Sequence, residues 1–444
     1  MARLGILDTF QLKDSDDLVI VGRLQGTIHV GDPVSVRNPG DDDDEIQETS
    51  IQAIEIEKRQ QASEASDRFV GIRLKDGRHL GLKKASVMYT TEEEQKNIID
   101  TYIRTLGETY VIKQELDLSE QDLIAMSITD CAETGRLFRW YLSQNKPSEE
   151  EEETKKQEYN ARMARLAKAL IQKLLDADGV YCVYSKLTGE PYMSSRTLQR
   201  DEGYLCSPPN IRIFTKAFDT IVRPAFPEDK FEIRYIENGE NNDGIRNFLS
   251  DVFYLNGAYG VEVVSDQMTL IGSQMIPAPD YSDTPQDSIP LTNPNLVRWM
   301  LLLGQLEDSE DENKQLNRNL YYRFMSMELV KARFLIPVKP VDGEKPERKE
   351  NGEILLKKDT KFSFPTVGGK AERPAVRMYT DWKRLREVFG QDSEGLTQTI
   401  DGMITVMDCA INVTQQQYSH AGCYIGKETF EEMKKISLPQ QPNS

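Results

Sequence analysis

Two heptapeptides far apart in the chain follow one pattern. Residues 209–215 are Pro-Asn-Ile-Arg-Ile-Phe-Thr, and residues 374–380 are Pro-Ala-Val-Arg-Met-Tyr-Thr. Three positions are identical, and three more keep their chemical character. Self-similarity at this separation predicts two copies of one folding unit rather than a single continuous domain.

The segments around the two heptapeptides extend the match. In the first copy an amphipathic helix (159–176) and an apolar strand (180–183) come before the heptapeptide, and a helix (216–222) and a strand (260–264) come after it. The corresponding ranges of the second copy are 316–332, 334–338, 381–389 and 410–414, with a closing segment at 426–436. We therefore expect two repeated α/β modules, at residues 149–290 and 291–444.

This order resembles the N-terminal module of the enhanced-serine-sensitivity (SseB) family. The hallmark of that family is a strand ending in an aromatic residue and Thr, then a helix, and later a strand leading to Asn-Pro. The second copy resembles it better, through residues 338–340 and 375–380 and, in part, through Asn412. The first copy has Glu262 in place of that Asn. The resemblance implies an α/β fold over most of residues 159–436, and the family brings no defined chemistry.

The first ninety residues predict a different architecture. Short apolar or alternating runs recur from residue 4 to residue 88, with no helical pattern between them. Gly22, Gly26 and Gly31 fall where turns and close backbone approaches are expected. Six or seven short strands of this kind predict a small closed barrel, because closure removes exposed strand edges.

Three short motifs in this region resemble the second domain of elongation factor Tu-type translation GTPases. They are Val-Gly-Arg-Leu at 21–24, Gly-Thr-Ile at 26–28 and Val-Gly-Asp-Pro-Val at 30–34. Ser66, where the family usually has Gly, and an acidic run at 41–45 are departures at loop positions. The chain has no G-x-x-x-x-G-K-[ST] phosphate-binding loop, so we expect a barrel at residues 1–90 without a GTPase domain.

A helical connector is expected between the barrel and the first α/β module, at residues 91–148. Apolar residues repeat at helical spacing before Leu106, and Ser119 has the sequence context of a helix N-cap. The acidic run at 148–153 marks the boundary with the next domain. The full expectation is a multidomain chain made of an all-β barrel, a helical connector and two repeated α/β modules.

The charge of the chain disfavours nucleic acid and anionic membranes as partners. There are 73 acidic and 55 basic side chains, a net charge of -18, and glutamates interrupt the densest basic stretch, at 345–361. The N-terminus has no export signal, and the longest apolar run, at 299–303, is too short for a membrane span. The five cysteines have no metal-like spacing. We expect a cytoplasmic protein with buried thiols.

No catalytic motif is found in the sequence. The three histidines are His29, His79 and His420, and a Cys/His nucleophile formed by His420 and Cys423 is disfavoured because the two are near neighbours in the sequence. No G-x-S-x-G, H-E-x-x-H or C-x-x-C motif occurs. We expect no enzyme activity, no cofactor and no metal.

The candidate partner surface is drawn from the repeated motif and its aromatic neighbours. Arg212 and Arg377 occupy the same place in the two heptapeptides, where an inward side chain would clamp a carboxylate and an outward one is the usual case. Tyr379 and Trp382 follow in the second copy, and interfaces favour such aromatic residues. The leading hypothesis is a non-catalytic adaptor or scaffold that binds a protein partner.

Two alternatives remain open. In the first, the barrel contacts a ribosome or a tRNA end, as its resemblance implies. In the second, carboxylates and Arg in a cleft between the two α/β modules form the site of a small-molecule sensor or an enzyme, because junctions between modules are common pocket sites.

Overall fold

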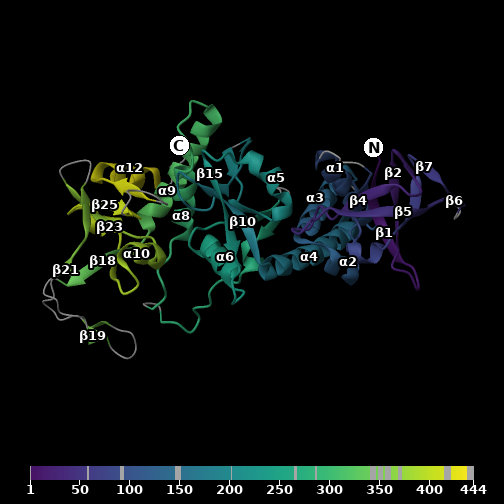
Figure 1. Ribbon diagram of the computed structural model, residues 1–444. Helices are drawn as coiled ribbons and strands as arrows, with labels where there is room; N and C mark the ends of the chain where they lie inside the picture. Colours follow the sequence, from purple (N-terminus) through teal and green to yellow (C-terminus); the bar gives the residue numbers. More distant parts are fainter. Residues whose placement is uncertain are drawn as a thin grey trace.

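The computed structural model describes residues 2–57, 60–90, 95–145, 152–201, 203–264, 268–285, 288–340, 347–348, 354–355, 362–368, 373–414 and 422–437. Three parts follow one another in chain order (Figure 1). A barrel with its helical connector lies at one end, a first α/β unit lies in the middle, and a second α/β unit lies at the other end. The described part of the chain is therefore multidomain, as predicted.

The N-terminal part is a closed antiparallel barrel. Its strands are β1 (Arg3–Gln11), β2 (Leu18–Gln25), β4 (Pro33–Arg37), β5 (Gln47–Ile56), β8 (Phe69–Leu74) and β9 (Val87–Tyr89). They pair in the order β4-β9-β1-β2-β8-β5, and β5 pairs back to β4. Smaller pieces complete it: β3 (Thr27–His29) pairs with β7 (Glu64–Ser66), β6 (Gln60–Ala62) extends β5, and η2 (Gly77–Leu80) precedes β9. The predicted closed barrel is confirmed.

Two features of the sequence determine how this barrel packs: side chains that alternate between inside and outside along each strand, and glycine where two strands lie very close. Leu4, Ile6 and Ile20 are fully buried, because alternate side chains of each strand point inward. A Cβ atom at Gly22 would clash with the carbonyl oxygen of Gly5 on β1, so the two strands can cross closely only with glycine there. The main cluster of the barrel core is separate from the large cluster that runs through the connector and both α/β units, although Val87 and Tyr89 of β9 belong to the latter.

The connector is helical. It contains α1 (Gln95–Leu106), the π-helical turn η3 (Gly107–Ile112), α2 (Glu120–Ala125) and α3 (Ile128–Gln144), and α4 (Glu152–Asp176) follows. Ser119 forms a capping box with Asp122, which confirms the predicted N-cap. A second capping box, Ser127 with Asp130, opens α3. The acidic run expected to mark the boundary, at 148–153, lies outside the described residues up to residue 151.

The first α/β unit contains one mixed sheet. Its strands are β10 (Gly179–Ser185), β11 (Met193–Ser194), β14 (Asn210–Phe214), β15 (Phe231–Glu237), β16 (Gly260–Val263) and β17 (Thr269–Ile271). The order is β15-β10-β14-β16-β17, with β14 and β16 parallel and the other neighbours antiparallel. Its helices are α6 (Gly244–Tyr254) and α7 (Gly272–Met275). The predicted helix at 216–222 consists of two short helices, η4 (Lys216–Phe218) and α5 (Asp219–Val222). The 3-10 turn η5 (Arg223–Ala225) follows, and Pro224 in it has no backbone N–H to donate to a longer helix.

The second α/β unit pairs its strands in a comparable order. Its strands are β18 (Phe334–Pro340), β21 (Phe362–Ser363), β22 (Thr366–Gly368), β23 (Pro374–Met378), β24 (Glu394–Gln398), β25 (Asp408–Ile411) and β26 (Cys423–Ile425). β24 pairs with β18, and an isolated bridge joins Leu335 of β18 to Tyr379, the residue directly after β23. β23 then pairs with β25, and β25 pairs with β26. β23 and β25 are parallel, as are β14 and β16. A small hairpin pairs β19 (Glu347–Arg348) with β20 (Ile354–Leu355); the rest of the basic stretch lies outside the described residues.

The described helices from residue 294 onward are α8 (Pro294–Gly304), α9 (Glu312–Lys331), α10 (Trp382–Phe389), α11 (Ile400–Ile404) and α12 (Lys427–Ser437). α8 also contacts the first unit, where Arg298 donates to the carbonyl of Gly257. The apolar run at 299–303 lies inside α8, as expected. No helix in the described ranges has both the length and the apolar character that crossing a bilayer requires.

Strand register corrects one detail of the sequence alignment. Glu262 lies opposite Arg212 in β14, whereas Val264 and Asn412 each come directly after the inner parallel strand. Both have positive φ, 62° and 50°, and each donates its backbone N–H back across the sheet. The place of Asn412 is therefore taken in the first unit by Val264, not by Glu262.

Candidate functional site

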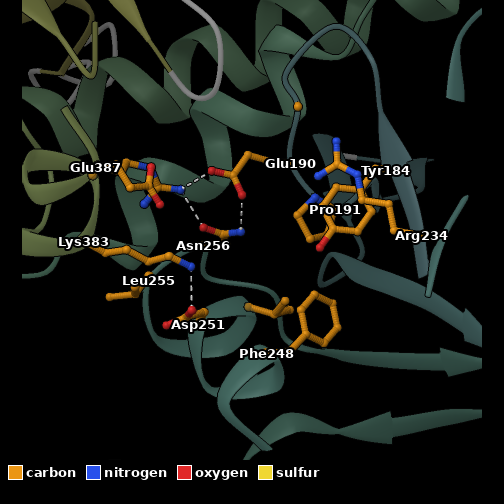
Figure 2. Close-up of a pocket in the computed structure, with 13 residues that line it drawn as sticks. Tyr184, Glu190, Pro191, Arg234, Phe248, Asp251, Leu255, Asn256, Lys383 and Glu387 are labelled. Carbon is orange, nitrogen blue, oxygen red and sulfur yellow. Dashed lines mark hydrogen bonds and ion pairs between the residues drawn. The ribbon is translucent and has the colours of Figure 1, made fainter. Parts of the chain in front are cut away.

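A cavity of about 200 Å³ lies between the two α/β units. Its walls come from the turn between β10 and β11, from α6 and the residues after it, and from α10 (Figure 2). The lining residues are Tyr184, Gly189, Glu190, Pro191, Arg234, Phe248, Asp251, Val252, Leu255, Asn256, Lys383, Arg384 and Glu387. Side chains from both units are required to form it.

Polar side chains before α10 determine the residue at which this helix begins. Asp381 caps the helix by accepting the backbone N–H of Arg384 at 3.0 Å, and the hydroxyl of Thr380 donates to the Asp381 carboxylate at 2.8 Å. Asn412 accepts the backbone N–H of Thr380 at 3.0 Å. The Thr of the heptapeptide therefore anchors the start of the helix that carries the charged wall of the cavity.

Arg384 is the centre of a buried polar network. Its Nη1 donates to Asp381 at 2.6 Å, and its Nη2 donates to Glu190 at 2.8 Å and to Asn256 at 2.6 Å. Asn256 in turn donates to the second oxygen of Glu190 at 3.1 Å. Burial favours loss of the proton, but the carboxylates of Asp381 and Glu190 outweigh it and raise the pKa of Arg384. The guanidinium of Arg384 is thus held charged and buried at the junction of the two units.

A second ion pair crosses the junction nearer the solvent. Lys383 donates to Asp251 of α6 at 2.6 Å, and Figure 2 shows its side chain directed toward that carboxylate. Burial acts to lower the pKa of Lys383, but Asp251, with the charges of Glu387 and Glu190, raises it overall. The cavity therefore has a charged ammonium at its α10 wall.

The opposite wall combines aromatic and apolar groups. The guanidinium of Arg234 lies 4.1 Å from the ring centroid of Tyr184 and donates to Glu232 at 2.6 Å. Phe248 adds apolar surface on this side, whereas Leu255 lies beside Lys383 (Figure 2). Figure 2 shows Tyr184, Pro191 and Arg234 on one side and the α10 residues on the other.

A larger cleft of about 660 Å³ lies between the barrel and the first α/β unit. Its lining includes Asp42, Asp43, Glu45 and Asp178, with Lys216 as one of the few cations. The backbone N–H of Ala217 donates to Asp42 at 2.8 Å, so the cleft also joins the two parts. Carboxylates outnumber cations in this lining, so the cleft has a strong negative charge.

A hairpin outside the main sheet of the first unit exposes large apolar side chains. It is formed by β12 (Thr197–Arg200) and β13 (Gly203–Cys206), with Leu198 paired directly to Leu205. Leu198 is 51% exposed, Leu205 53% and Tyr204 48%. Leu198 and Leu205, directly opposite each other and therefore on one face of the ribbon, form a candidate protein-binding surface, called here the apolar hairpin. Tyr204, next to Leu205 in the strand, is exposed on the other face.

The described residues form no group of three or more His, Cys, Asp and Glu side chains that could hold a metal ion. Burial raises the pKa of the Cys131 and Cys409 thiols to about 12 and also raises that of Cys182. These thiols are protonated at neutral pH, so they are poor nucleophiles. His420, from the disfavoured Cys/His pair, lies outside the described residues.

The four residues predicted as a partner surface occupy different environments. Arg212 donates to Glu262 at 2.8 Å. It therefore clamps a carboxylate, although an outward-facing side chain was the more usual expectation. Arg377 lies over the ring of Phe389 at 5.8 Å. Tyr379 is 1% exposed and donates to the carbonyl of Val413 at 2.7 Å, which makes it a core residue.

Trp382, the fourth predicted residue, is half-buried at the start of α10, beside the cavity-lining residues Lys383 and Arg384. None of the described contacts of Arg212 is with Arg377, Tyr379 or Trp382. Sequence reasoning missed Glu190, Asn256 and Arg384. One signal existed: Asp381 and Arg384 are three residues apart in a predicted helix, a spacing at which opposite charges pair.

Comparisons of the chain with protein-family models and with curated proteins gave no match.

Proposed function

We propose that this chain is a non-catalytic adaptor that binds a protein partner through the apolar hairpin. The observation that carries the proposal is the direct cross-strand pair of Leu198 and Leu205, both about half exposed on one face of the hairpin. Burial of exposed apolar surface is the main driving force of protein association. Clusters of exposed apolar side chains are typical of binding sites.

The contacts between the parts support a scaffold with a fixed arrangement. The hydroxyls of Thr129 in α3 and Thr215 after β14 lie 2.7 Å apart and are buried, which joins the connector to the first unit. Lys83 of the barrel donates to Asp130 of α3 at 2.7 Å. With the Arg384 network at the other junction, such contacts hold the parts of the chain in one arrangement, which reduces the entropy lost on binding.

The acidic cleft beside the barrel weighs against the ribosome or tRNA alternative. Asp42, Asp43 and Glu45 stand at this face of the barrel, and carboxylates repel the phosphate backbone. A barrel of translation-factor type is still compatible with a protein partner.

We also propose that the two α/β units are copies of one SseB-like module and that the barrel is related to the second domain of elongation factor Tu. The pairing order, with one parallel pair beside antiparallel neighbours in each unit, supports the first part. An experimental structure in which the two units cannot be superposed strand for strand would refute it.

The test of the adaptor function is affinity purification of the tagged full chain from its source cells at low and moderate salt. Proteins are identified by mass spectrometry, and RNA is quantified. The double variant Leu198→Ser/Leu205→Ser removes the hairpin pair, and Val406→Ser, at a side chain 69% exposed, is the matched control. We expect a stoichiometric protein that persists at moderate salt with wild type and control and is lost with the double variant. Recovery of ribosomal proteins and RNA that disappear as salt rises would favour the translation-linked alternative instead.

A further inference from the structure

We propose that the cavity between the two α/β units binds a small zwitterion, a free amino acid with an apolar side chain. The ligand carboxylate would face Lys383, its ammonium would face Glu387, and its side chain would face Phe248 and Leu255. This inference concerns a site separate from the apolar hairpin, so its outcome is independent of the adaptor proposal.

The charged wall carries one cation and one anion at neighbouring positions. Lys383 and Glu387 are four residues apart on α10, which places them on one helix face. Lys383 uses one of its three N–H groups on Asp251. Glu387 has no hydrogen-bond or ion-pair partner among the described residues. The pair therefore offers a donor for a carboxylate and an acceptor for an ammonium, close together.

The remaining walls fit the rest of such a ligand. Phe248, Val252 and Leu255 of the α6 side provide apolar contact for a side chain. The volume, about 200 Å³, is below the range of about 300 to 1,000 Å³ that holds drug-sized molecules, so the occupant is small.

The charges of the lining favour a ligand that carries both signs. The lining contains Arg234, Lys383 and Arg384 as cations and Glu190, Asp251 and Glu387 as anions. Arg234 pairs with Glu232, Arg384 with Asp381 and Glu190, and Lys383 with Asp251, so Glu387 is the lining charge without a partner among the described residues. A ligand ammonium would pair with Glu387, and a carboxylate on the same ligand would accept the remaining N–H groups of Lys383. The buried Nε–H of Arg384, whose side chain is 7% exposed, has no acceptor among the described residues. A buried donor of this kind is normally satisfied by water or ligand.

The experiment is isothermal titration calorimetry of the full chain with L-alanine, L-valine, L-leucine, L-isoleucine and L-methionine. The tightest binder is then compared with its N-acetyl and amide derivatives, which each remove one of its two charges. We expect saturable binding of at least one amino acid and a loss of about tenfold or more in affinity with each derivative. No binding of any of the five below about 10 mM, or equal binding of the derivatives, would overturn the proposal.

Variants then assign the site. Glu387→Gln is expected to weaken binding by about tenfold, while Glu432→Gln, at an exposed position of α12, leaves it unchanged. Glu387 is exposed, so the variant should keep the circular dichroism spectrum and melting temperature of wild type. Wild-type affinity in Glu387→Gln would place any bound amino acid elsewhere and refute this site.

Discussion

Arg384 and Glu190 lie 194 positions apart in the chain and meet at 2.8 Å across the junction between the two α/β units. Their side chains are 7% and 19% exposed, so the contact is largely removed from water. Burying such a pair costs hydration that is recovered only while both partners are present. The junction is therefore specific: it is stable in one arrangement and costly to separate.

Replacing Arg384 tests this junction. Arg384→Met keeps much of the side-chain volume but leaves the carboxylates of Asp381 and Glu190 without their cation. We expect a loss of about 3 kcal/mol in unfolding free energy, measured by denaturant titration. Arg386→Met on the exposed face of the same helix is the control and should change stability by less than about 0.5 kcal/mol. Equal effects of the two variants would contradict the role given to Arg384.

The positive φ of Asn412 leads to a second prediction. Its side chain accepts the N–H of Thr380 and donates to the Thr380 hydroxyl, both at 3.0 Å. Asn412→Ala and Asn412→Gly both lose these bonds, but only alanine is strained at a φ of 50°. We expect Asn412→Ala to be less stable than Asn412→Gly by about 1 kcal/mol in chemical denaturation. The opposite order would show that backbone strain at this position is unimportant.

Gly40 tests the contact between the barrel and the connector. A Cβ atom there would clash with the Asp130 carboxylate and the Tyr102 hydroxyl, which are hydrogen-bonded to each other at 2.6 Å. We expect Gly40→Ala to lower the melting temperature by several degrees, in line with overpacking costs of about 1 to 3 kcal/mol. Gly203→Ala, which faces open space, is the control and should leave it unchanged. An unchanged melting temperature in Gly40→Ala would mean that the barrel and connector are not packed closely there.

The pH dependence of stability should include Asp122. Burial acts to raise the pKa of Asp122, but hydrogen bonds from Lys84 and Ser119 lower it below its ordinary value. A carboxyl with a lowered folded pKa contributes stability above its unfolded pKa, about 3.9, and loses it as pH falls through the folded pKa.

We therefore expect Asp122→Asn to lower the calorimetric melting temperature at pH 7, with a difference from wild type that shrinks below about pH 4. Glu120→Gln, exposed in the same turn, should show no such trend. A difference that stays constant from pH 7 to pH 3 would contradict the assigned shift.

Local patterns made part of the fold predictable. The barrel followed from alternation and glycine-marked turns, which are short-range signals, and Gly22 lies at the close strand crossing it was expected to mark. The two heptapeptides give the strands β14 and β23, because their apolar alternation suits a buried sheet. The helix expected at 216–222 is present as a 3-10 turn followed by one short α-helix, so the pattern located the helical segment but not its type.

The candidate site was less accessible to sequence reasoning. Its location between the modules was an open alternative, but Glu190, Asn256 and Arg384 come from three elements that are brought together only by tertiary packing. Single-sequence patterns carry no information on such pairings. The apolar hairpin was also missed, because a single leucine in each of two short strands is equally compatible with burial.

The most direct measurement of the adaptor proposal is site-specific photo-crosslinking in living source cells. Leu198→p-benzoylphenylalanine places the photoreactive group on the apolar hairpin, and Val406→p-benzoylphenylalanine places it on an unrelated exposed position. The proposal predicts a discrete protein adduct from position 198 that is absent from position 406. The absence of any discrete adduct at position 198, or the same adducts from both positions, would contradict it.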